Sequence, residues 1–275
     1  MAIDLSGKPI AITGASSGIG AATAIACARA GMPIALGARR QDRLREVVDL
    51  IRARGGRAIA VACDVDQPQD SQRLIDRCAS EFGGVYALFA NAGYGFESRV
   101  LDMDDARIEA IFRTNFYGTL HAIRAAAPRM LEARAGHILI CSSCLSKLAV
   151  PMYAAYSATK AAQDHFGRAL RLELAGTGVS CSTVHPVQTS TEFSVRTTAE
   201  SDGKAVMTGS GRSSQTPETV ARAIVRCLRK PKGEVWTSRG TRLAFALATA
   251  WPGLADRVIA KEWKRRAGVG RRSAP

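Results

Sequence analysis

Short apolar runs alternate along most of this chain with longer amphipathic or alanine-rich stretches. The apolar runs predict strands and the longer stretches predict helices, because a buried strand needs only about four to eight residues and a helix needs more. The predicted strands cover about residues 8–13, 32–38, 57–63, 85–90, 136–142, 179–184 and 233–237. The predicted helices cover about residues 20–30, 41–54, 68–82, 102–133, 153–175 and 216–230.

This alternation is typical of a parallel sheet with helices on both faces. A chain of 275 residues with 47% hydrophobic content can fill one large core, and no linker divides it. We therefore predict an α/β fold, doubly wound in three layers around a parallel sheet of about seven strands. Residues 1–238 form the main domain, and residues 239–275 form a C-terminal extension of it.

A glycine-rich turn, Thr13-Gly14-Ala15-Ser16-Ser17-Gly18-Ile19-Gly20, joins the first predicted strand to the first predicted helix. Strand, glycine turn and helix in this order indicate a dinucleotide site, since glycines let the backbone approach a pyrophosphate and the N–H groups at a helix start attract anions. An ordinary strand-to-helix turn with three glycines is the alternative.

Tyr156 and Lys160 are four residues apart, so a helix places both side chains on one face. A cation fixed beside a phenol would lower the tyrosine pKa from roughly 10 toward neutrality, where tyrosine becomes a useful acid or base. A solvated pair on an exposed helix is the alternative.

Together the glycine turn and the Tyr-x-x-x-Lys motif resemble the short-chain dehydrogenase/reductase family, which implies a three-layer Rossmann fold. The resemblance covers about residues 5–237, and several further motifs keep the family's order and spacing. These are Asn91-Ala92-Gly93 after a predicted strand, Thr114-Asn115-Phe116, Ser143 thirteen residues before Tyr156, and the segment from Pro186 to Thr191.

The resemblance implies that Asn115, Ser143, Tyr156 and Lys160 are the catalytic residues of an oxidoreductase. Tyr156 would exchange a proton with the oxygen of a carbonyl or secondary-alcohol substrate while a hydride passes to or from the nicotinamide. Ser143 would donate a hydrogen bond to the same oxygen. Lys160 would lower the pKa of Tyr156 and hold the nicotinamide ribose, and Asn115 would hold a water that links Lys160 to solvent.

The second predicted strand ends in Arg39-Arg40, where an acidic residue would favour NAD and a guanidinium suits the 2′-phosphate of NADP. NADP(H) is therefore the predicted cofactor, although Ser17 occupies a position that is often basic in NADP-preferring members. An NAD-dependent enzyme of the family, or a cofactor-binding sensor or scaffold without turnover, remains an alternative. The expected cofactor-binding residues are Gly14, Ser16, Ser17, Gly18, Ile19, Gly20, Arg39, Arg40, Asp64, Val65, Asn91, Ala92, Gly93, Tyr156, Lys160, Pro186, Thr189 and Thr191.

Residues from Ser190 to Gln215 lack a sustained apolar period, which predicts a flexible lid over the substrate, with a plain surface loop as the alternative. Beyond residue 238, the apolar run from Leu243 to Trp251 and the basic amphipathic stretch after Pro252 leave three readings open. They are a pocket-closing or dimer-packing tail, an interfacial membrane anchor for an enzyme of a lipophilic substrate, and a solvated helix. The family resemblance implies a homo-oligomer, either a dimer or a tetramer.

The net charge of +14 suits an anionic cofactor and anionic lipid. Nucleic acid is not an expected partner, since no recognition motif accompanies the charge. Seven scattered cysteines indicate buried thiols rather than disulfides, and the four histidines lack metal-ligand spacing, so no metal is expected. Residues 1–7 do not resemble a signal peptide. The expected location is the cytoplasm, with peripheral membrane contact through the tail left open.

Overall fold

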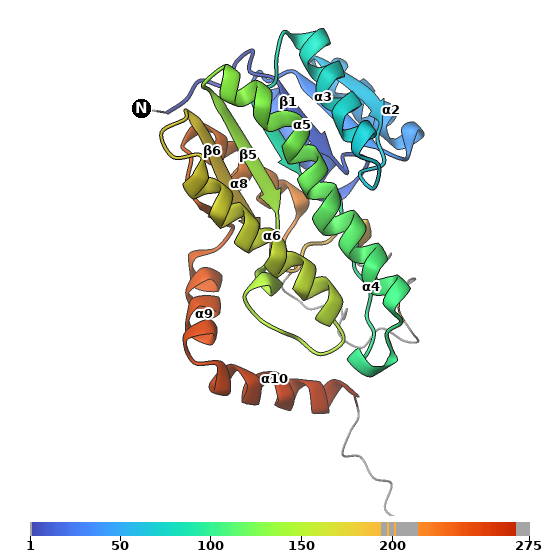
Figure 1. Ribbon diagram of the computed structural model, residues 1–275, viewed down its shortest axis with the longest axis vertical. Coiled ribbons are helices and arrows are strands. Elements are labelled where there is room, and N and C mark those ends of the chain that lie inside the picture. Colours follow the sequence, from blue (N-terminus) through green and yellow to red (C-terminus); the bar gives the residue numbers. More distant parts are fainter. Residues whose placement is uncertain (1, 194–196, 198–200, 202–213, 268–275) are drawn as a thin grey trace, which may run out of the picture.

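The computed structural model describes residues 2–193, 197, 201 and 214–267 (Figure 1). Seven strands form one parallel sheet in the order β3-β2-β1-β4-β5-β6-β7. The strands are β1 (Ile10–Thr13), β2 (Ile34–Ala38), β3 (Ala58–Ala62), β4 (Ala87–Ala90), β5 (Gly136–Cys141), β6 (Val179–His185) and β7 (Glu234–Trp236). The predicted fold class and all seven predicted strands are confirmed.

The longer helices are α1 (Gly18–Arg29), α2 (Gln41–Arg52), α3 (Pro68–Phe82), α4 (Asp105–Phe112), α5 (Gly118–Glu132), α6 (Ala154–Glu173), α8 (Pro217–Arg229), α9 (Arg239–Ala250) and α10 (Pro252–Ala267). Three short helical segments are η1 (Val100–Asp102), η2 (Arg113–Tyr117) and η3 (Cys144–Ser146). Most of the predicted helices are therefore present close to their expected ranges.

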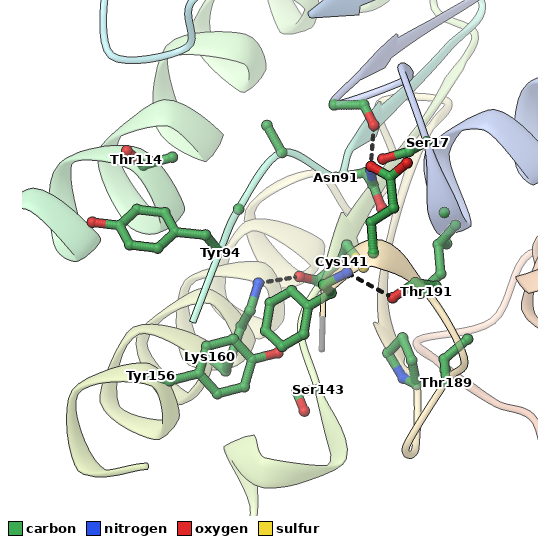
Figure 2. Close-up of a pocket in the computed structure, with 18 of the residues that line it drawn as sticks. Ser17, Asn91, Tyr94, Thr114, Cys141, Ser143, Tyr156, Lys160, Thr189 and Thr191 are labelled. Carbon is green, nitrogen blue, oxygen red and sulfur yellow. Dashed lines mark hydrogen bonds between the residues drawn. The ribbon is translucent and has the colours of Figure 1, made fainter. Parts of the chain in front are cut away.

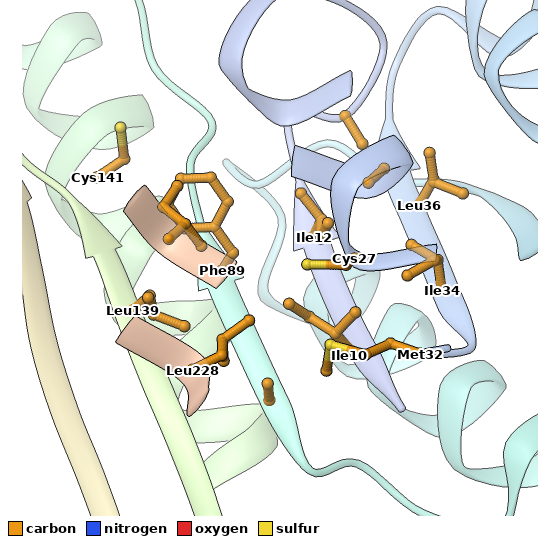
Figure 3. Close-up of a cluster of buried hydrophobic side chains, with 14 of the residues drawn as sticks. Ile10, Ile12, Cys27, Met32, Ile34, Leu36, Phe89, Leu139, Cys141 and Leu228 are labelled. Carbon is orange, nitrogen blue, oxygen red and sulfur yellow. The ribbon is translucent and has the colours of Figure 1, made fainter. Parts of the chain in front are cut away.

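Helices cover both faces of the sheet and bury two apolar layers. On one face, residues of α1, α2 and α8 pack on the strands, and Figure 3 shows Cys27 and Leu228 against Ile12 and Phe89. On the other face, residues of α3 and α5 and the end of α6 form the second layer. All seven cysteines are buried free thiols, as the sequence predicts.

The predicted helix over residues 102–133 is present over residues 105–132, where η2 divides it into α4 and α5. Asp104 caps α4 by accepting a hydrogen bond from the Arg107 N–H at 2.8 Å, so α4 begins at residue 105. Between α4 and α5, η2 forms a π-helical turn that contains Asn115. A π turn widens the helix and releases carbonyl groups from the regular i→i−4 pattern, which is why such turns are common at functional sites.

The carboxyl ends of the parallel strands meet at one edge, and the strand order reverses between β1 and β4. Folds of this kind bind ligands in the crevice at that reversal. The glycine turn after β1, Asn91 after β4, Ser143 after β5 and Pro186 after β6 all lie at this edge.

The C-terminal extension forms α9 and α10, which lie along one end of the molecule (Figure 1). In the described part of the chain no single helix is long and apolar enough to cross a bilayer, although α9 and α10 reach that length and composition together across a bend of 110°. Most of the predicted lid, residues 194–196, 198–200 and 202–213, lies outside the described residues.

Candidate active site

A cavity of about 450 Å³ follows the carboxyl edge of the sheet from the end of β2 to α6. Nearly all of the predicted site residues line it. They are Gly14, Ser16, Ser17, Gly18, Ile19, Arg39, Arg40, Asp64, Val65, Asn91, Ala92, Gly93, Ser143, Tyr156, Lys160, Pro186, Thr189 and Thr191. The two other predicted residues, Gly20 and Asn115, are buried, and their roles are described below.

The glycine turn fits a dinucleotide. Gly14 has a φ of +65°, and a Cβ there would lie 2.8 Å from the Ala92 Cα, so only glycine allows this approach of two backbones. At Gly20 a Cβ would collide with the Gly14 carbonyl. Helix α1 begins at Gly18, has no side-chain cap from Ser17 and has no acidic residue in its first turn. Its first N–H groups can therefore receive a pyrophosphate.

Asn91 fixes the shape of this turn from the neighbouring strand. Its side-chain amide donates to the carbonyls of Thr13 at 3.1 Å and Gly14 at 3.2 Å, and its backbone N–H donates to the Thr13 hydroxyl at 3.0 Å. Asn91 therefore joins the ends of β1 and β4 on the cavity wall.

The guanidinium of Arg40 lies beside Ser17, at the position that is often basic in NADP-preferring members of the family. Its guanidinium donates to the Ser17 hydroxyl at 2.8 Å and to the Ser16 hydroxyl at 3.1 Å. Its other terminal nitrogen pairs at 2.9 Å with Glu192, and this hydrogen bond holds the pKa of the Glu192 carboxyl below its usual range. Arg39 is exposed and lines the same end of the cavity.

The segment after β6 crosses the cavity from its catalytic end to the glycine turn. The Pro186 carbonyl accepts from the Cys144 N–H at 3.1 Å, beside Ser143. Farther along, Thr191 lies so close to Gly18 that a Cβ on that glycine would be 3.2 Å from the Thr191 Cγ2. The segment therefore covers the glycine turn.

Tyr156, Lys160 and Ser143 converge at the other end of the cavity (Figure 2). Tyr156 and Lys160 lie one turn apart on α6, with the Lys160 Nζ 5.6 Å from the centre of the Tyr156 ring. Burial raises the pKa of Tyr156, and a hydrogen bond with the Ser143 side chain acts in the opposite direction. Burial lowers the pKa of Lys160 to about 8. In the free protein burial therefore outweighs the expected lowering of the Tyr156 pKa by Lys160.

Asn115 supports the site from behind the cavity wall. Its side chain accepts from the Tyr94 N–H and donates to the Tyr94 carbonyl, both at 2.9 Å. A Cβ on Gly93 would lie 2.9 Å from the Asn115 Oδ1, so this close packing requires glycine. The main-chain carbonyl of Asn115 accepts from the side-chain amide of Gln163 at 2.7 Å.

Comparison with known proteins identifies the family. The family model described as short chain dehydrogenase matches residues 8–202. This chain belongs to the short-chain dehydrogenase family. An uncharacterized oxidoreductase of Listeria innocua is 34% identical over 228 residues, which cover 82% of this chain and 92% of that protein.

Two solved structures resemble this one. A short-chain dehydrogenase/reductase from Burkholderia phymatum in complex with NAD has a TM-score of 0.82 at 27% identity and covers 92% of this chain and 96% of its own. An alcohol dehydrogenase from Thermococcus sibiricus complexed with 5-hydroxy-NADP has a TM-score of 0.71 at 27% identity and covers 83% and 94%. The fold is thus similar to that of proteins with either cofactor type.

Behind Ser143, this short-chain dehydrogenase carries a partly buried charged cluster that the sequence did not reveal. His185 Nδ1 donates to the main-chain carbonyl of Ser143 at 3.1 Å. Asp164, His185 and Glu234 have ligand-type atoms within 4.8 Å of one another. The Lys147 ammonium lies between the two carboxylates, 2.5 Å from Asp164 and 3.2 Å from Glu234, and so provides a cation there. The cluster supports the backbone of Ser143.

The substrate end of this short-chain dehydrogenase is largely apolar. Leu145, Val150, Tyr153 and Phe193 line the cavity and pack in the same cluster as Tyr156. The rings of Phe193 and Tyr156 lie 5.4 Å apart. No sequence motif marks these residues, because their meeting depends on how η3 and the segment after β6 fold over α6.

Proposed function

We propose that this short-chain dehydrogenase is an NADP(H)-dependent oxidoreductase acting on a carbonyl or secondary-alcohol substrate. The observation that carries the proposal is the meeting of Tyr156, Ser143 and Lys160 in one cavity with a glycine turn that fits a dinucleotide. A bound nicotinamide would supply or accept the hydride of the reaction.

Tyr156 is suited to act as an acid toward a carbonyl oxygen. Because burial raises its pKa, the phenol stays protonated near neutral pH and can give its proton as negative charge grows on that oxygen. Ser143 would donate a hydrogen bond to the same oxygen. Lys160, still largely charged below its pKa of about 8, stabilises the phenolate that remains. These properties favour the reductive direction.

The preference for NADP(H) rests on the cations at the adenosine end of the cavity. Arg40 lies on the hydroxyls of Ser16 and Ser17, and Arg39 is exposed beside them. A guanidinium with neighbouring hydroxyl donors suits a phosphate, whereas the ribose hydroxyls of NAD favour a carboxylate at the end of β2. An NAD-dependent enzyme is the alternative, and tighter binding of NADH than of NADPH would establish it.

The apolar lining around Tyr156 supports a lipophilic substrate. Leu145, Val150 and Phe193 leave few polar groups to hold a hydrophilic one. A sensor or scaffold that binds cofactor without turnover is the other alternative. It has no need for a tyrosine, a lysine and a serine that meet at one point.

A homo-oligomer and a cytoplasmic location remain predictions. Tyr117 at the end of η2 and Phe166 on α6 are each 51% exposed. Both rings contact that of Phe116, at 5.4 Å for Tyr117 and 4.8 Å for Phe166. Exposed aromatic residues of this kind favour an interface between copies of the chain. Sedimentation velocity of the protein and of Phe166→Ser tests it, with a smaller species expected for the variant.

A panel of carbonyl compounds, including long-chain ketones and aldehydes, tests the proposed reaction. Oxidation of NADPH is followed at 340 nm, with NADH at the same concentration as the comparison. We expect turnover of at least one lipophilic carbonyl and faster turnover with NADPH. Binding of both cofactors without turnover of any compound would favour the sensor or scaffold instead.

A further inference from the structure

A hydrogen-bonded bridge joins Lys160 to the π turn that carries Asn115. The Lys160 ammonium donates to the side-chain carbonyl of Gln163 at 2.9 Å, and the amide nitrogen of Gln163 donates to the main-chain carbonyl of Asn115 at 2.7 Å. The Thr119 hydroxyl donates to the same Asn115 carbonyl at 2.8 Å. Gln163 and Asn115 are 1% and 0% exposed, so solvent does not compete for these bonds.

The Gln163 amide and the Thr119 hydroxyl both donate to the Asn115 main-chain carbonyl. A carbonyl oxygen has two lone pairs, and Gln163 and Thr119 use both of those on Asn115. A water can pass a proton along by exchanging its bonds, but a primary amide cannot do so without changing to its imidic acid form. The bridge therefore fixes Lys160 in place and does not conduct protons.

We propose that Gln163 is a positioning residue that holds Lys160 charged and aimed at Tyr156 for the reaction proposed above. The second acceptor of the ammonium is the Cys141 carbonyl at 2.8 Å. Hydrogen bonds to these two acceptors hold the Lys160 side chain in one orientation along α6. Without the Gln163 carbonyl, the buried Lys160 ammonium would lose one of its two acceptors, and its charged form would become less stable.

Few other titratable groups face Lys160 and Tyr156. From β5 and η3 these are the thiols of Cys141 and Cys144, and burial raises the pKa of both, to about 11 at Cys144, so they stay neutral near pH 8. Tyr153 packs on the ring of Tyr156 and donates to Glu97 at 3.0 Å. Near pH 8, Lys160 is therefore the titrating group that Gln163 contacts most directly.

Gln163→Met tests the proposal, because methionine has a similar shape and lacks the acceptor. The ¹³Cε resonance of Lys160 is titrated in full-length protein carrying ¹³C-lysine and is assigned by its loss in Lys160→Met. We expect the pKa of Lys160 to fall by about one pH unit, as the loss of one hydrogen bond to a charged group predicts. In the pH profile of carbonyl reduction, the pKa of the alkaline limb is expected to fall by the same amount.

Thr119→Val is the matched control, since its hydroxyl accepts from the Gln163 amide at 2.6 Å but does not touch Lys160 or the Gln163 carbonyl. Its Lys160 pKa is expected to stay within about 0.3 unit of the wild-type value. An unchanged pKa in Gln163→Met, or an equal shift in Thr119→Val, would overturn the proposal. Gln163→Asn, whose shorter amide cannot reach both partners, replaces the methionine variant if that one does not fold. The titration needs no substrate, so its outcome is independent of the proposed reaction.

A second, independent observation concerns an apolar stripe on α9 and α10. Leu243, Leu247, Trp251, Leu254 and Val258 follow one another at helical spacing, and each is between 45% and 63% exposed. No residue of α9 is buried. Neither helix contributes to the lining of the active-site cavity among the described residues, which argues against a pocket-closing tail.

The opposite sides of these helices hold them against the main domain. Phe245 of α9 packs on Trp236 with a ring distance of 5.9 Å, and Thr249 donates to the Lys147 carbonyl at 3.3 Å. Trp263 of α10 borders a shallow apolar hollow with Leu101 and Met152. The stripe therefore faces away from the domain.

The charged residues around the stripe indicate what kind of surface it contacts. The exposed cations of the two helices are Arg239, Arg242, Arg257, Lys261, Lys264 and Arg265. The acidic residues there are only Asp256 and Glu262, counted over residues 239–265. A symmetric contact between two copies would place these cations against each other, whereas an anionic lipid surface attracts them.

We infer that α9 and α10 lie on an anionic membrane surface with the stripe in the interface between headgroups and acyl chains. Trp251, 60% exposed at the bend between the helices, is a residue type that favours this depth. The hollow beside Trp263 is formed by the chain just after Val150, which lines the active-site cavity. A lipophilic substrate could therefore enter from the bilayer side.

Flotation of the full chain with vesicles of phosphatidylcholine alone or with 30% phosphatidylserine tests this inference. We expect binding to the anionic vesicles, at least fivefold weaker for Trp251→Ala/Leu254→Ser and weaker in 0.5 M NaCl. Leu50→Ser, which changes an exposed leucine on α2, is the control and should bind like wild type. Equal binding of wild type and the double variant would overturn the inference. The inference would also be overturned if the wild type bound no vesicles but self-associated in sedimentation experiments, and the double variant did not self-associate.

Discussion

If Arg40 holds the 2′-phosphate of NADPH as proposed, Glu192 competes with that phosphate, and its removal is expected to tighten NADPH binding. The carboxylate lies 2.9 Å from the guanidinium that also contacts Ser16 and Ser17. A 2′-phosphate held by Arg40 would have to share this cation with Glu192 or displace it. Glu192→Gln keeps the size of the side chain and removes its charge.

The size of the effect follows from the exposure of the pair. The side chains of Arg40 and Glu192 are 37% and 46% exposed, so the ion pair contributes no more than about 1 kcal/mol. Repulsion between two anions that share one guanidinium adds an energy of similar order, screened by solvent. We therefore expect a gain of about 1 kcal/mol, which corresponds to roughly fivefold tighter binding.

Calorimetric titration with NADPH and NADH measures the change. The gain is expected for NADPH alone, since NADH has no 2′-phosphate, and it should shrink in 0.5 M NaCl. Asp76→Asn is the matched control, because it neutralises a similarly exposed carboxylate paired with Arg129 away from the cavity. Unchanged or weaker NADPH binding in Glu192→Gln, or an equal gain for NADH, would refute the role given to Arg40.

Three further changes test other parts of the site. Ser143→Ala is expected to lower kcat about 100-fold or more while NADPH affinity stays constant, because it removes a donor to the substrate oxygen, and calorimetry together with the rate assay checks both. Burial lowers the Lys160 pKa from 10.5 to about 8, so between these pH values the unfolded chain binds a proton that the folded protein has released. The free energy of unfolding of the wild type should therefore rise by up to about 3 kcal/mol between about pH 8 and 10.5. Lys160→Met should remove this rise. Urea midpoints at pH 7.5 and 10 measure it, and an equal rise in the variant would contradict the assignment. Gly14→Ala should weaken NADPH binding and lower the Tm, because its φ of +65° costs alanine about 1–2 kcal/mol and its Cβ would lie 2.8 Å from the Ala92 Cα; a variant with wild-type Tm and affinity would argue against the close approach.

The fold was predictable because its signals are local and repeated. Alternating apolar runs located all seven strands, and parallel strands bring their carboxyl ends to one edge whatever their order. That edge brings together Gly14, Asn91, Ser143 and Pro186, which the family resemblance had assigned to one site. The π turn inside the helix over residues 105–132 was not predicted, because such a turn has no distinct composition; Asn115 in this turn bonds with residues distant in the sequence.

The missing parts of the site depend on side-chain directions. Arg40 reaches Ser17 from a different strand end, and no pattern in the chain specifies that rotamer. Gln163 did leave a signal, since it lies three residues after Lys160 on the same helix and therefore on a neighbouring face. Its second partner, Asn115, is 48 residues away, and only the folded protein joins the two.

Replacing Tyr156 with phenylalanine tests the central claim most directly. The ring and its packing on Phe193 are retained, while the proton donor beside Ser143 is lost. With a carbonyl substrate identified by NADPH oxidation, we expect Tyr156→Phe to bind NADPH with unchanged Kd and to lose at least about a thousandfold in kcat. A variant that binds NADPH normally and still reduces the carbonyl at the wild-type rate would contradict the assignment of Tyr156 as the acid.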